Sequence, residues 1–100
     1  MTAQEKIRFT LADGSRDCLN GALAAARRAS TTKQAADGLW DASQSVAAAD
    51  SDGSFFLTAR DLYWIGKASR PEYWRDEMTM TYVMANVQGQ FNAWSIGDSK

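Results

Sequence analysis

The chain opens with a strict alternation of apolar and polar residues. Between Glu5 and Leu11 every second residue is apolar, namely Ile7, Phe9 and Leu11. Successive side chains of an extended segment point to opposite faces, so a period of two places these three residues on one face. The pattern therefore predicts a half-buried strand over residues 5–11.

The next segment has helical spacing. Asp13-Gly14 supplies a turn, and Ser15 is a candidate N-cap for a helix that continues to about Ala29. Apolar residues then recur every three or four positions, which is typical of a helix with one buried side. The predicted buried stripe is Leu19, Ala22, Leu23 and Ala26.

A capping-box pattern over residues 31–34, Thr-Thr-Lys-Gln, predicts a second helix with Thr31 as its N-cap. Gly38 weakens this helix by about 1 kcal/mol relative to alanine. The turn residues 50–53 end it. Its predicted buried stripe is Ala36, Leu39, Trp40, Ser43, Val46 and Ala47.

Residues 54–74 allow two interpretations. Phe55-Phe56-Leu57 fits a short strand, whereas Thr58-Ala59-Arg60-Asp61 resembles a helix start that leads to Ser69. We favour a short third helix. Pro71 ends that element and fits the first position of a brief helical turn through Tyr73 and Trp74.

The C-terminal segment alternates again, with Met78, Met80, Tyr82 and Met84 on one face. Thr, Tyr and Val are frequent here, so we predict a strand, a tight turn at Gln88-Gly89, and an antiparallel partner strand over Gln90–Ile96. The polar residues after Ile96, 97–100, are expected to fray.

Together these elements predict an α+β fold in one small domain spanning residues 1–100. The N-terminal strand and the C-terminal hairpin would form a three-stranded antiparallel sheet, with two or three helices packed on one face. An all-α fold is the alternative, because Pro71 to Asn86 also fits one long helix.

Composition narrows the functional classes. The 100 residues include 11 basic and 12 acidic side chains, so no net field would hold the chain on nucleic acid or an anionic membrane. Cys18 is the single cysteine, and the N-terminus lacks the apolar run of a signal peptide. We therefore expect a cytoplasmic protein without a membrane segment or an intramolecular disulfide.

The sequence lacks the residues that most enzyme mechanisms require. With no histidine there is no Ser-His or Cys-His pair and no histidine-based zinc site. We interpret Cys18 as a small buried thiol, Asp50 and Asp52 as turn residues without calcium-loop spacing, and Asp76-Glu77 as a solvated pair. The sequence predicts no enzyme, and no catalytic, cofactor-binding or metal-binding residue.

The strongest positive feature is the segment from Arg60 to Arg75, in which large aromatic residues alternate with cations. Tryptophan, tyrosine and arginine are enriched at interface hot spots because they offer large, rigid contact area. The alternative is that these rings fill the core, although neighbouring rings of a regular element cannot both point inward. The candidate partner-binding residues are Tyr63, Trp64, Arg70, Tyr73, Trp74 and Arg75.

In length, slight acidity, expected α+β fold and absence of cofactor motifs, the whole chain resembles the small phage-encoded anti-CRISPR proteins, in particular inhibitors of type I systems. This resemblance implies a viral protein of the bacterial cytoplasm that binds a crRNA-guided surveillance complex. It would inhibit that complex by blocking target-DNA binding or nuclease recruitment.

Two other hypotheses use the same residues. A small nucleic-acid-binding or phage regulatory protein would stack bases on the aromatic rings and neutralise phosphates with the arginines. A structural or immunity protein would pair with a toxin or a virion component instead. Near-neutral net charge makes direct nucleic-acid binding the second choice.

Overall fold

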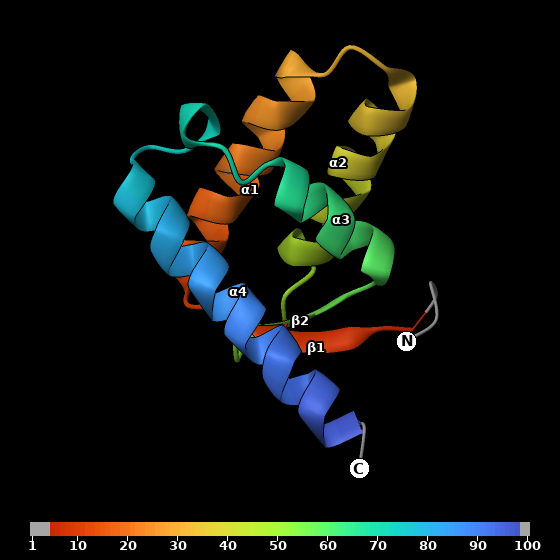
Figure 1. The fold of residues 1–100 in the computed structure, drawn as a ribbon, viewed down its shortest axis with the longest axis vertical. Helices are drawn as coiled ribbons and strands as arrows, with labels where there is room; N and C mark the ends of the chain where they lie inside the picture. The colour runs from red at the N-terminus through yellow and green to blue at the C-terminus, as the bar shows by residue number, and fades with distance from the viewer. Residues whose placement is uncertain (1–4, 99–100) are drawn as a thin grey trace.

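Four helices and one two-stranded sheet make up residues 5–98, the part of the chain that this computed structural model describes (Figure 1). In chain order the elements are β1 (Ile7–Thr10), α1 (Asp13–Ala29), α2 (Lys33–Ala47), β2 (Ser54–Leu57), α3 (Ala59–Lys67), the 3-10 turn η1 (Pro71–Tyr73) and α4 (Glu77–Asp98). Helices α1 and α2 form a helical hairpin, α3 lies against α2, and α4 runs diagonally past α1 and β1 (Figure 1).

The N-terminal strand is confirmed. Strand β1 pairs with β2 in antiparallel register, with Ile7 opposite Leu57 and Phe9 opposite Phe55. The apolar residues of the alternating segment are buried, and the rings of Phe9 and Phe55 stack with their centroids 6.2 Å apart. The period-two pattern therefore identified both the strand and its inward face.

The buried stripe of α1 is also confirmed in full, but its predicted N-cap is wrong. The helix begins at Asp13, and its N-cap is Ala12, which offers no side-chain acceptor. Ser15 thus lies inside the first turn. Burial of the stripe against the sheet and α2 stabilises this helix without the cap, since tertiary packing supplies most helical stability.

Helix α2 begins one residue later than predicted. The Thr32 hydroxyl, and not that of Thr31, accepts the hydrogen bond from the Ala35 N–H, at 3.1 Å. The buried side of α2 is centred on Gly38, Leu39, Ala42 and Val46, which leaves Trp40 exposed. Gly38 faces inward, and the Trp64 indole lies directly against it because glycine has no side chain there.

The segment after α2 contains both structures that the sequence allowed. Ser54–Leu57 forms strand β2, and the favoured short helix follows directly as α3. Thr58 and Asp61 form the reciprocal capping box, in which the Asp61 N–H donates to the Thr58 hydroxyl and the Thr58 N–H donates to the Asp61 carboxylate. The left-handed Gly53 closes the preceding turn, with a φ of 84°.

The predicted C-terminal hairpin is wrong, and with it the three-stranded α+β fold. Glu77 to Asp98 form one continuous helix, and residues 5–98 contain only the two strands β1 and β2. The all-α alternative is nearer to the structure in this region, because it predicted a helix here. However, a non-helical segment separates η1 from α4, so Pro71 to Asn86 is not one helix. The predicted frayed tail is also partly helical, because α4 continues through Gly97; residues 99–100 lie outside the described part.

A second pattern in the same segment explains the helix. Its larger apolar residues also recur at spacings of three and four, and in that register they face the core; they are Met80, Val83, Met84, Val87, Phe91 and Trp94. Only a helix brings all of them to one side. The alternation of methionine with threonine over residues 78–81 was local and did not decide the fold.

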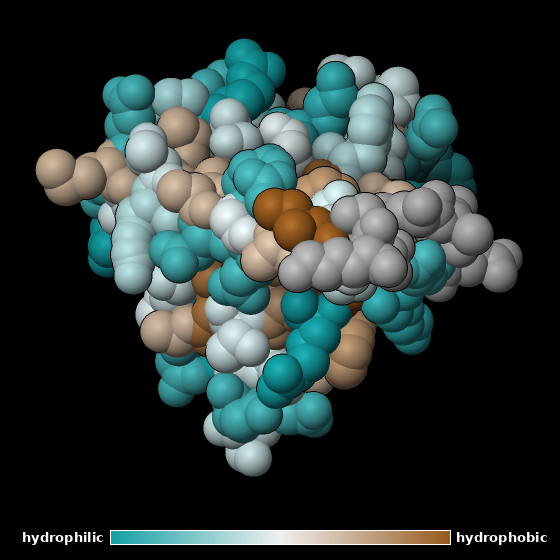
Figure 2. Space-filling view, turned by 60° about the horizontal axis from the view of Figure 1, so that its bottom comes forward, coloured by the Kyte–Doolittle hydropathy of each residue, from teal (hydrophilic) through white to brown (hydrophobic). Residues whose placement is uncertain are grey.

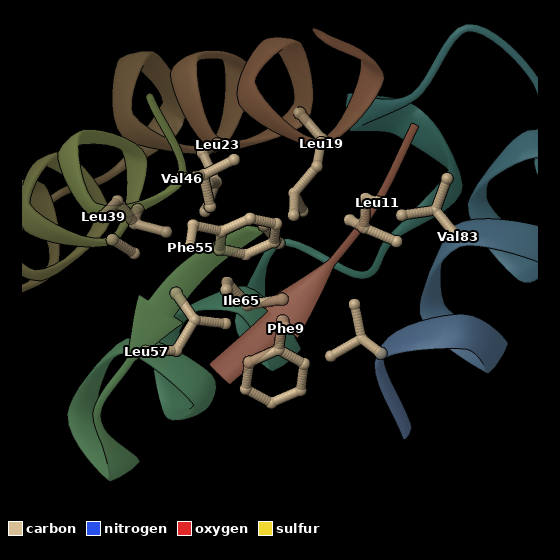
Figure 3. Close-up of a cluster of buried hydrophobic side chains, with 14 of the residues drawn as sticks. Phe9, Leu11, Leu19, Leu23, Leu39, Val46, Phe55, Leu57, Ile65 and Val83 are labelled. Carbon is tan, nitrogen blue, oxygen red and sulfur yellow. The ribbon is translucent and has the colours of Figure 1, made fainter. Parts of the chain in front are cut away.

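The core lies between the sheet and the helices. Phe9 and Phe55 occupy its centre, with Leu19 and Leu23 arriving from α1 and Val83 from α4 (Figure 3). Every described element except η1 contributes a buried apolar side chain. No helix among the described residues is both long and apolar enough to traverse a bilayer.

Candidate partner-binding surface

The six predicted binding residues do not gather on one element. Tyr63 and Trp64 belong to α3, Tyr73 is the last residue of η1, and Arg70 and Trp74 flank that turn. Arg75 comes shortly before α4. The structure thus distributes them over a helix, a loop and the approach to a second helix.

On α3 the two neighbouring rings have different roles. Tyr63 is 56% exposed, and Lys67 holds its ammonium 5.4 Å from the centre of the tyrosine ring. Trp64 meets Tyr63 edge to face, with the centroids 4.9 Å apart, and its indole fills the space where Gly38 has no side chain. Tyr63 is therefore available to a partner, while Trp64 joins α3 to α2.

A second cation and ring pair flanks η1. The Arg70 guanidinium lies 5.8 Å from the centre of the Tyr73 ring, and it forms an ion pair of 2.8 Å with Glu72. Tyr73 is partly exposed. Because both Arg70 and Tyr73 reach solvent beside one another, this pair also remains a candidate contact.

Trp74 does not present its ring to solvent. It is only 7% exposed, and its indole N–H donates to the Ala68 carbonyl at 2.8 Å. This contact fastens the loop after α3, and a buried tryptophan N–H needs such an acceptor. The prediction that one residue of each neighbouring aromatic pair reaches the surface is confirmed for Tyr63.

Trp40 was predicted in the buried stripe of α2, but it lies on the surface of that helix. The Arg27 guanidinium, at the end of α1, stands 4.9 Å from the centre of its ring. The signal that was missed is a second set of residues with helical spacing, Gly38, Leu39, Ala42 and Val46, whose small members mark the face that packs closely. Trp40 and Arg27 therefore form a third surface pair of ring and cation.

Most of the cations already have an acidic partner. Six ion pairs among residues 5–98 each engage a different basic residue: Arg8 with Asp52, Arg16 with Asp13, Lys33 with Asp37, Arg60 with Asp41, Arg70 with Glu72, and Arg75 with Asp76. The hydrogen bond from Lys33 lowers the pKa of Asp37. Positive charge is thus neutralised locally instead of forming a continuous track.

The second surface missed by the sequence analysis is a groove of about 610 Å³ between α1 and the first half of α4. Met78, 83% exposed, and Tyr82, 58% exposed, stand on its α4 side together with Arg75. Cys18 lines the opposite side and is partly exposed, contrary to the buried thiol that we predicted. Met78 and Tyr82 were predicted on a strand, so their common position on one side of a helix was not recognised.

Residues 5–98 bring no three cysteine or acidic side chains together as metal ligands. The arrangement instead offers surface contacts: ring and cation pairs on α2, α3 and η1, and an apolar groove beside α4. Comparison of the chain with protein-family models, curated proteins and solved structures finds no match.

Proposed function

We propose that this chain is a non-enzymatic binding protein that inhibits a partner protein by occupying its surface. The observation that carries the proposal is a set of three pairs at the surface, Arg27 with Trp40, Lys67 with Tyr63, and Arg70 with Tyr73. Trp40 and Tyr63 are exposed, whereas Tyr73 also packs partly against the core. Two of the pairs join an arginine to an aromatic ring, residue types that are enriched at interface hot spots, and in the third Lys67 takes the place of the arginine. A cation within about 6 Å of a ring also orders both side chains before binding, which lowers the entropic cost of association.

Charge compensation favours a protein partner over nucleic acid. Phosphate recognition needs several uncompensated cations, whose released counterions supply much of the binding free energy. In this chain Arg60, Arg70 and Arg75 each lie within ion-pair distance of a carboxylate. Binding a phosphate track would separate those pairs, whereas a protein surface of mixed polarity accommodates them.

The most specific form of the proposal follows from the resemblance to small anti-CRISPR proteins. The partner would then be a crRNA-guided surveillance complex, and steric blockage of target DNA or of the nuclease would be the mechanism. The support is the chain's length, its near-neutral charge and its surface aromatic residues. A type I surveillance complex is accordingly the first partner to test.

The test measures the affinity of the partner for single-alanine variants. The partner is either that complex or a protein retained by the immobilised chain from a bacterial lysate. We expect Tyr63→Ala or Tyr73→Ala to raise the dissociation constant by at least about 30-fold, which is equivalent to about 2 kcal/mol of lost binding free energy for a true hot spot. Phe56→Ala is the matched control, since Phe56 is an exposed ring on β2 outside the three pairs.

Unchanged affinity in all variants of the three pairs would refute this assignment of the surface. The nucleic-acid hypothesis predicts something different: the isolated chain should shift DNA or RNA in a gel at low salt, with affinity falling steeply as salt rises. Turnover of a small molecule, abolished by changing one side chain, would refute the non-enzymatic proposal itself.

A further inference from the structure

Two adjacent arginines near the end of α1 are exceptions to the local pairing of charges. Arg27 and Arg28 are both exposed, and among residues 5–98 no carboxylate lies within ion-pair distance of either. Every other arginine in that part of the chain has an acidic partner. Two positive charges therefore stand side by side without local compensation.

These arginines border the loop that joins α1 to α2. Two hollows meet at them: one of about 380 Å³ against loop residues 30–32, and one of about 260 Å³ on the Trp40 side of α2. Both hollows are lined by Arg27 and Arg28, and neither has an acidic residue in its described lining. We call this region the α1–α2 corner, and its residues are Arg27, Arg28, Ser30, Thr31, Thr32 and Trp40.

The corner forms one end of the molecule. The loop between α1 and α2 lies at the top of Figure 1, remote from the two strands and from the last turns of α4. The opposite end, which Figure 2 turns toward the viewer, shows hydrophilic and apolar residues intermixed over its visible part. A partner can thus reach the corner without contact with the sheet.

The acidic side chains farther along α2 do not neutralise the corner. Arg27 acts on Asp37 only through its field, because the Asp37 carboxylate is held by the Lys33 ammonium at 2.5 Å. The Asp41 carboxylate is held by Arg60 of α3 at 2.6 Å. Each of these carboxylates is matched by a cation of its own, so the two arginines of the corner remain in excess.

The helix ends that meet at the corner offset one another. The end of α1 carries a negative partial charge of about half an elementary charge, and the start of α2 carries about the same positive amount. The Ser30 hydroxyl already donates to the Arg27 carbonyl at 2.6 Å, and the first turn of α2 contains no acidic residue. The corner therefore keeps the positive charge of its side chains.

Trp40 adds a flat apolar surface beside these charges. Its ring is 48% exposed, and the Arg27 guanidinium stands 4.9 Å from the ring centre. An arginine stacked on an aromatic ring still offers the N–H groups at its edge to a carboxylate. The remaining lining of the Trp40 hollow includes several aliphatic side chains, namely Leu23, Ala24, Leu39 and Ala47.

This combination fits an acidic protein segment better than nucleic acid. A guanidinium binds a carboxylate through two parallel hydrogen bonds, and the hollow beside Trp40 suits an apolar side chain next to that carboxylate. Nucleic acid gains its affinity from many neutralised phosphates, and two arginines release few counterions. The charge and the apolar lining thus point to the same kind of partner.

We infer that the α1–α2 corner binds an acidic segment of the partner protein, in which carboxylates flank an apolar side chain. Arg27 and Arg28 bind the carboxylates, and Trp40 covers the apolar side chain. The inference rests on the proposed function, because Arg27 with Trp40 is one of its three pairs, and it adds the chemistry of the surface that is bound.

The test follows the indole N–H signal of Trp40 in nitrogen–proton correlation spectra of the full chain. Trp40→Phe identifies this signal among those of the four tryptophans. The probes are a capped acidic peptide, Glu-Asp-Leu-Leu-Glu-Asp, its uncharged counterpart, Gln-Asn-Leu-Leu-Gln-Asn, and a short oligothymidine, each titrated to about 2 mM, the range of weak complexes. We expect saturable movement of the signal with the acidic peptide and at least about tenfold weaker binding of the other two probes.

Three results would overturn the inference. The Trp40 signal could stay in place when the acidic peptide is added, or it could move equally with the uncharged peptide. Tighter binding of the oligothymidine would instead assign the corner to nucleic acid.

Arg28→Gln tests the corner apart from the three pairs, since Arg28 belongs to none of them. The side chain is exposed and has no ion pair, so the variant will fold. We expect it to weaken binding of the acidic peptide by at least about fivefold. Lys6→Gln is the matched control: Lys6 is exposed just before β1 and also lacks an ion pair among residues 5–98, so removing its charge should leave the affinity unchanged. Equal losses in both variants would show an effect of net charge alone and contradict the inference.

Measurements on the partner itself separate this inference from the proposed function. If Tyr63→Ala and Tyr73→Ala weaken partner binding while Arg28→Gln does not, the proposed function stands and the acidic segment is wrong. If acidic-peptide binding depends on Arg28 but no variant of the three pairs changes partner binding, the corner binds acidic segments and the proposed function fails.

Discussion

Helices α2 and α4 both turn a long face to solvent, and the two faces differ in charge. On α2, Lys33 pairs with Asp37 at 2.5 Å and Asp41 pairs with Arg60 at 2.6 Å. On α4 the exposed residues include Met78, Tyr82 and Ile96, and no charged residue occurs between Glu77 and Asp98. Two exposed helix faces therefore differ in kind: α2 has charges that keep its face hydrated, whereas the solvent side of α4 has apolar and uncharged polar residues.

The largest contrast is expected from the same substitution in both helices. Gly38→Ala on α2 places a Cβ 2.1 Å from the Trp64 Nε1, so the indole must move. We expect the free energy of unfolding to fall by about 2 kcal/mol, since overpacking outweighs the gain in helix propensity. Urea denaturation measures the change, and tryptophan fluorescence should shift as Trp64 becomes more exposed.

Gly89→Ala on α4 is the counterpart. Its Cβ meets nothing within 4 Å, so the helix gains propensity and stability should rise by about 0.5–1 kcal/mol. The two substitutions are thus predicted to have opposite signs. If both stabilise the chain, the close packing of Trp64 on Gly38 is wrong.

The polar contacts that hold α2 and α4 to the rest of the molecule differ as well. For α2 the contact to test is the one between Ser45 and Asp61 of α3. This carboxylate is almost fully buried; it accepts from the Thr58 N–H at 3.1 Å and from the Ser45 hydroxyl of α2 at 3.0 Å. Asp61→Ala removes the side-chain half of the capping box of α3 and leaves those donors without this acceptor, so we expect the free energy of unfolding to fall by about 2 kcal/mol in urea denaturation. Asp61→Asn retains one acceptor oxygen and should lose less; an equal loss would argue against the capping role.

The polar attachment of α4 is weaker. The Gln90 side chain pairs with the backbone of Thr10 in β1 much as a neighbouring strand would. Its carbonyl accepts from the Thr10 N–H at 2.8 Å, and its amide donates to the Thr10 carbonyl at 2.7 Å. Water can replace both contacts because Thr10 is exposed, so Gln90→Ala should cost only about 1 kcal/mol. Faster hydrogen exchange at the Thr10 amide would locate the loss, and an unchanged rate would contradict the pairing.

The same comparison explains which parts of the fold were predictable. The stripe of α1, the alternation in β1 and the capping box at Thr58 each depend on neighbours within one turn or one strand, so local pattern was sufficient. The segment of α4 satisfies both a period of two over residues 78–85 and a helical period over its full length. The helical period extends over the full segment and buries its larger apolar residues, so it prevails over the shorter period of two on which the strand prediction was based.

The candidate site was predicted in part for a related reason. Composition located aromatic residues beside arginines, and the structure places Tyr63, Arg70 and Arg75 at the surface. Trp74 is buried because its indole N–H reaches the Ala68 carbonyl six residues earlier, and local composition cannot show that. Tyr82 was missed because its face follows from the helix that the sequence analysis did not predict.

The smallest predicted effect concerns pH. The pKa of Asp76, at the start of α4, is lowered from its ordinary value of 3.8, chiefly by the hydrogen bond from the Thr79 N–H, while Lys33 lowers the pKa of Asp37 on α2. A carboxyl group whose pKa is lower in the folded state contributes its stability fully above the unfolded value. That contribution is lost as the pH falls through the folded value.

Stability should therefore be retained from neutral pH down to the ordinary carboxyl pKa of 3.8 and then decline as the pH falls further. Asp76→Asn keeps a capping oxygen that does not titrate, so it should flatten this decline, and Asp37→Asn should do so too by removing the Lys33 pair. Salt distinguishes the two carboxylates: screening weakens the exposed ion pair on α2 more than the backbone hydrogen bond at α4. If added salt reduces both contributions equally, the cap of α4 is held by charge and not by the Thr79 N–H.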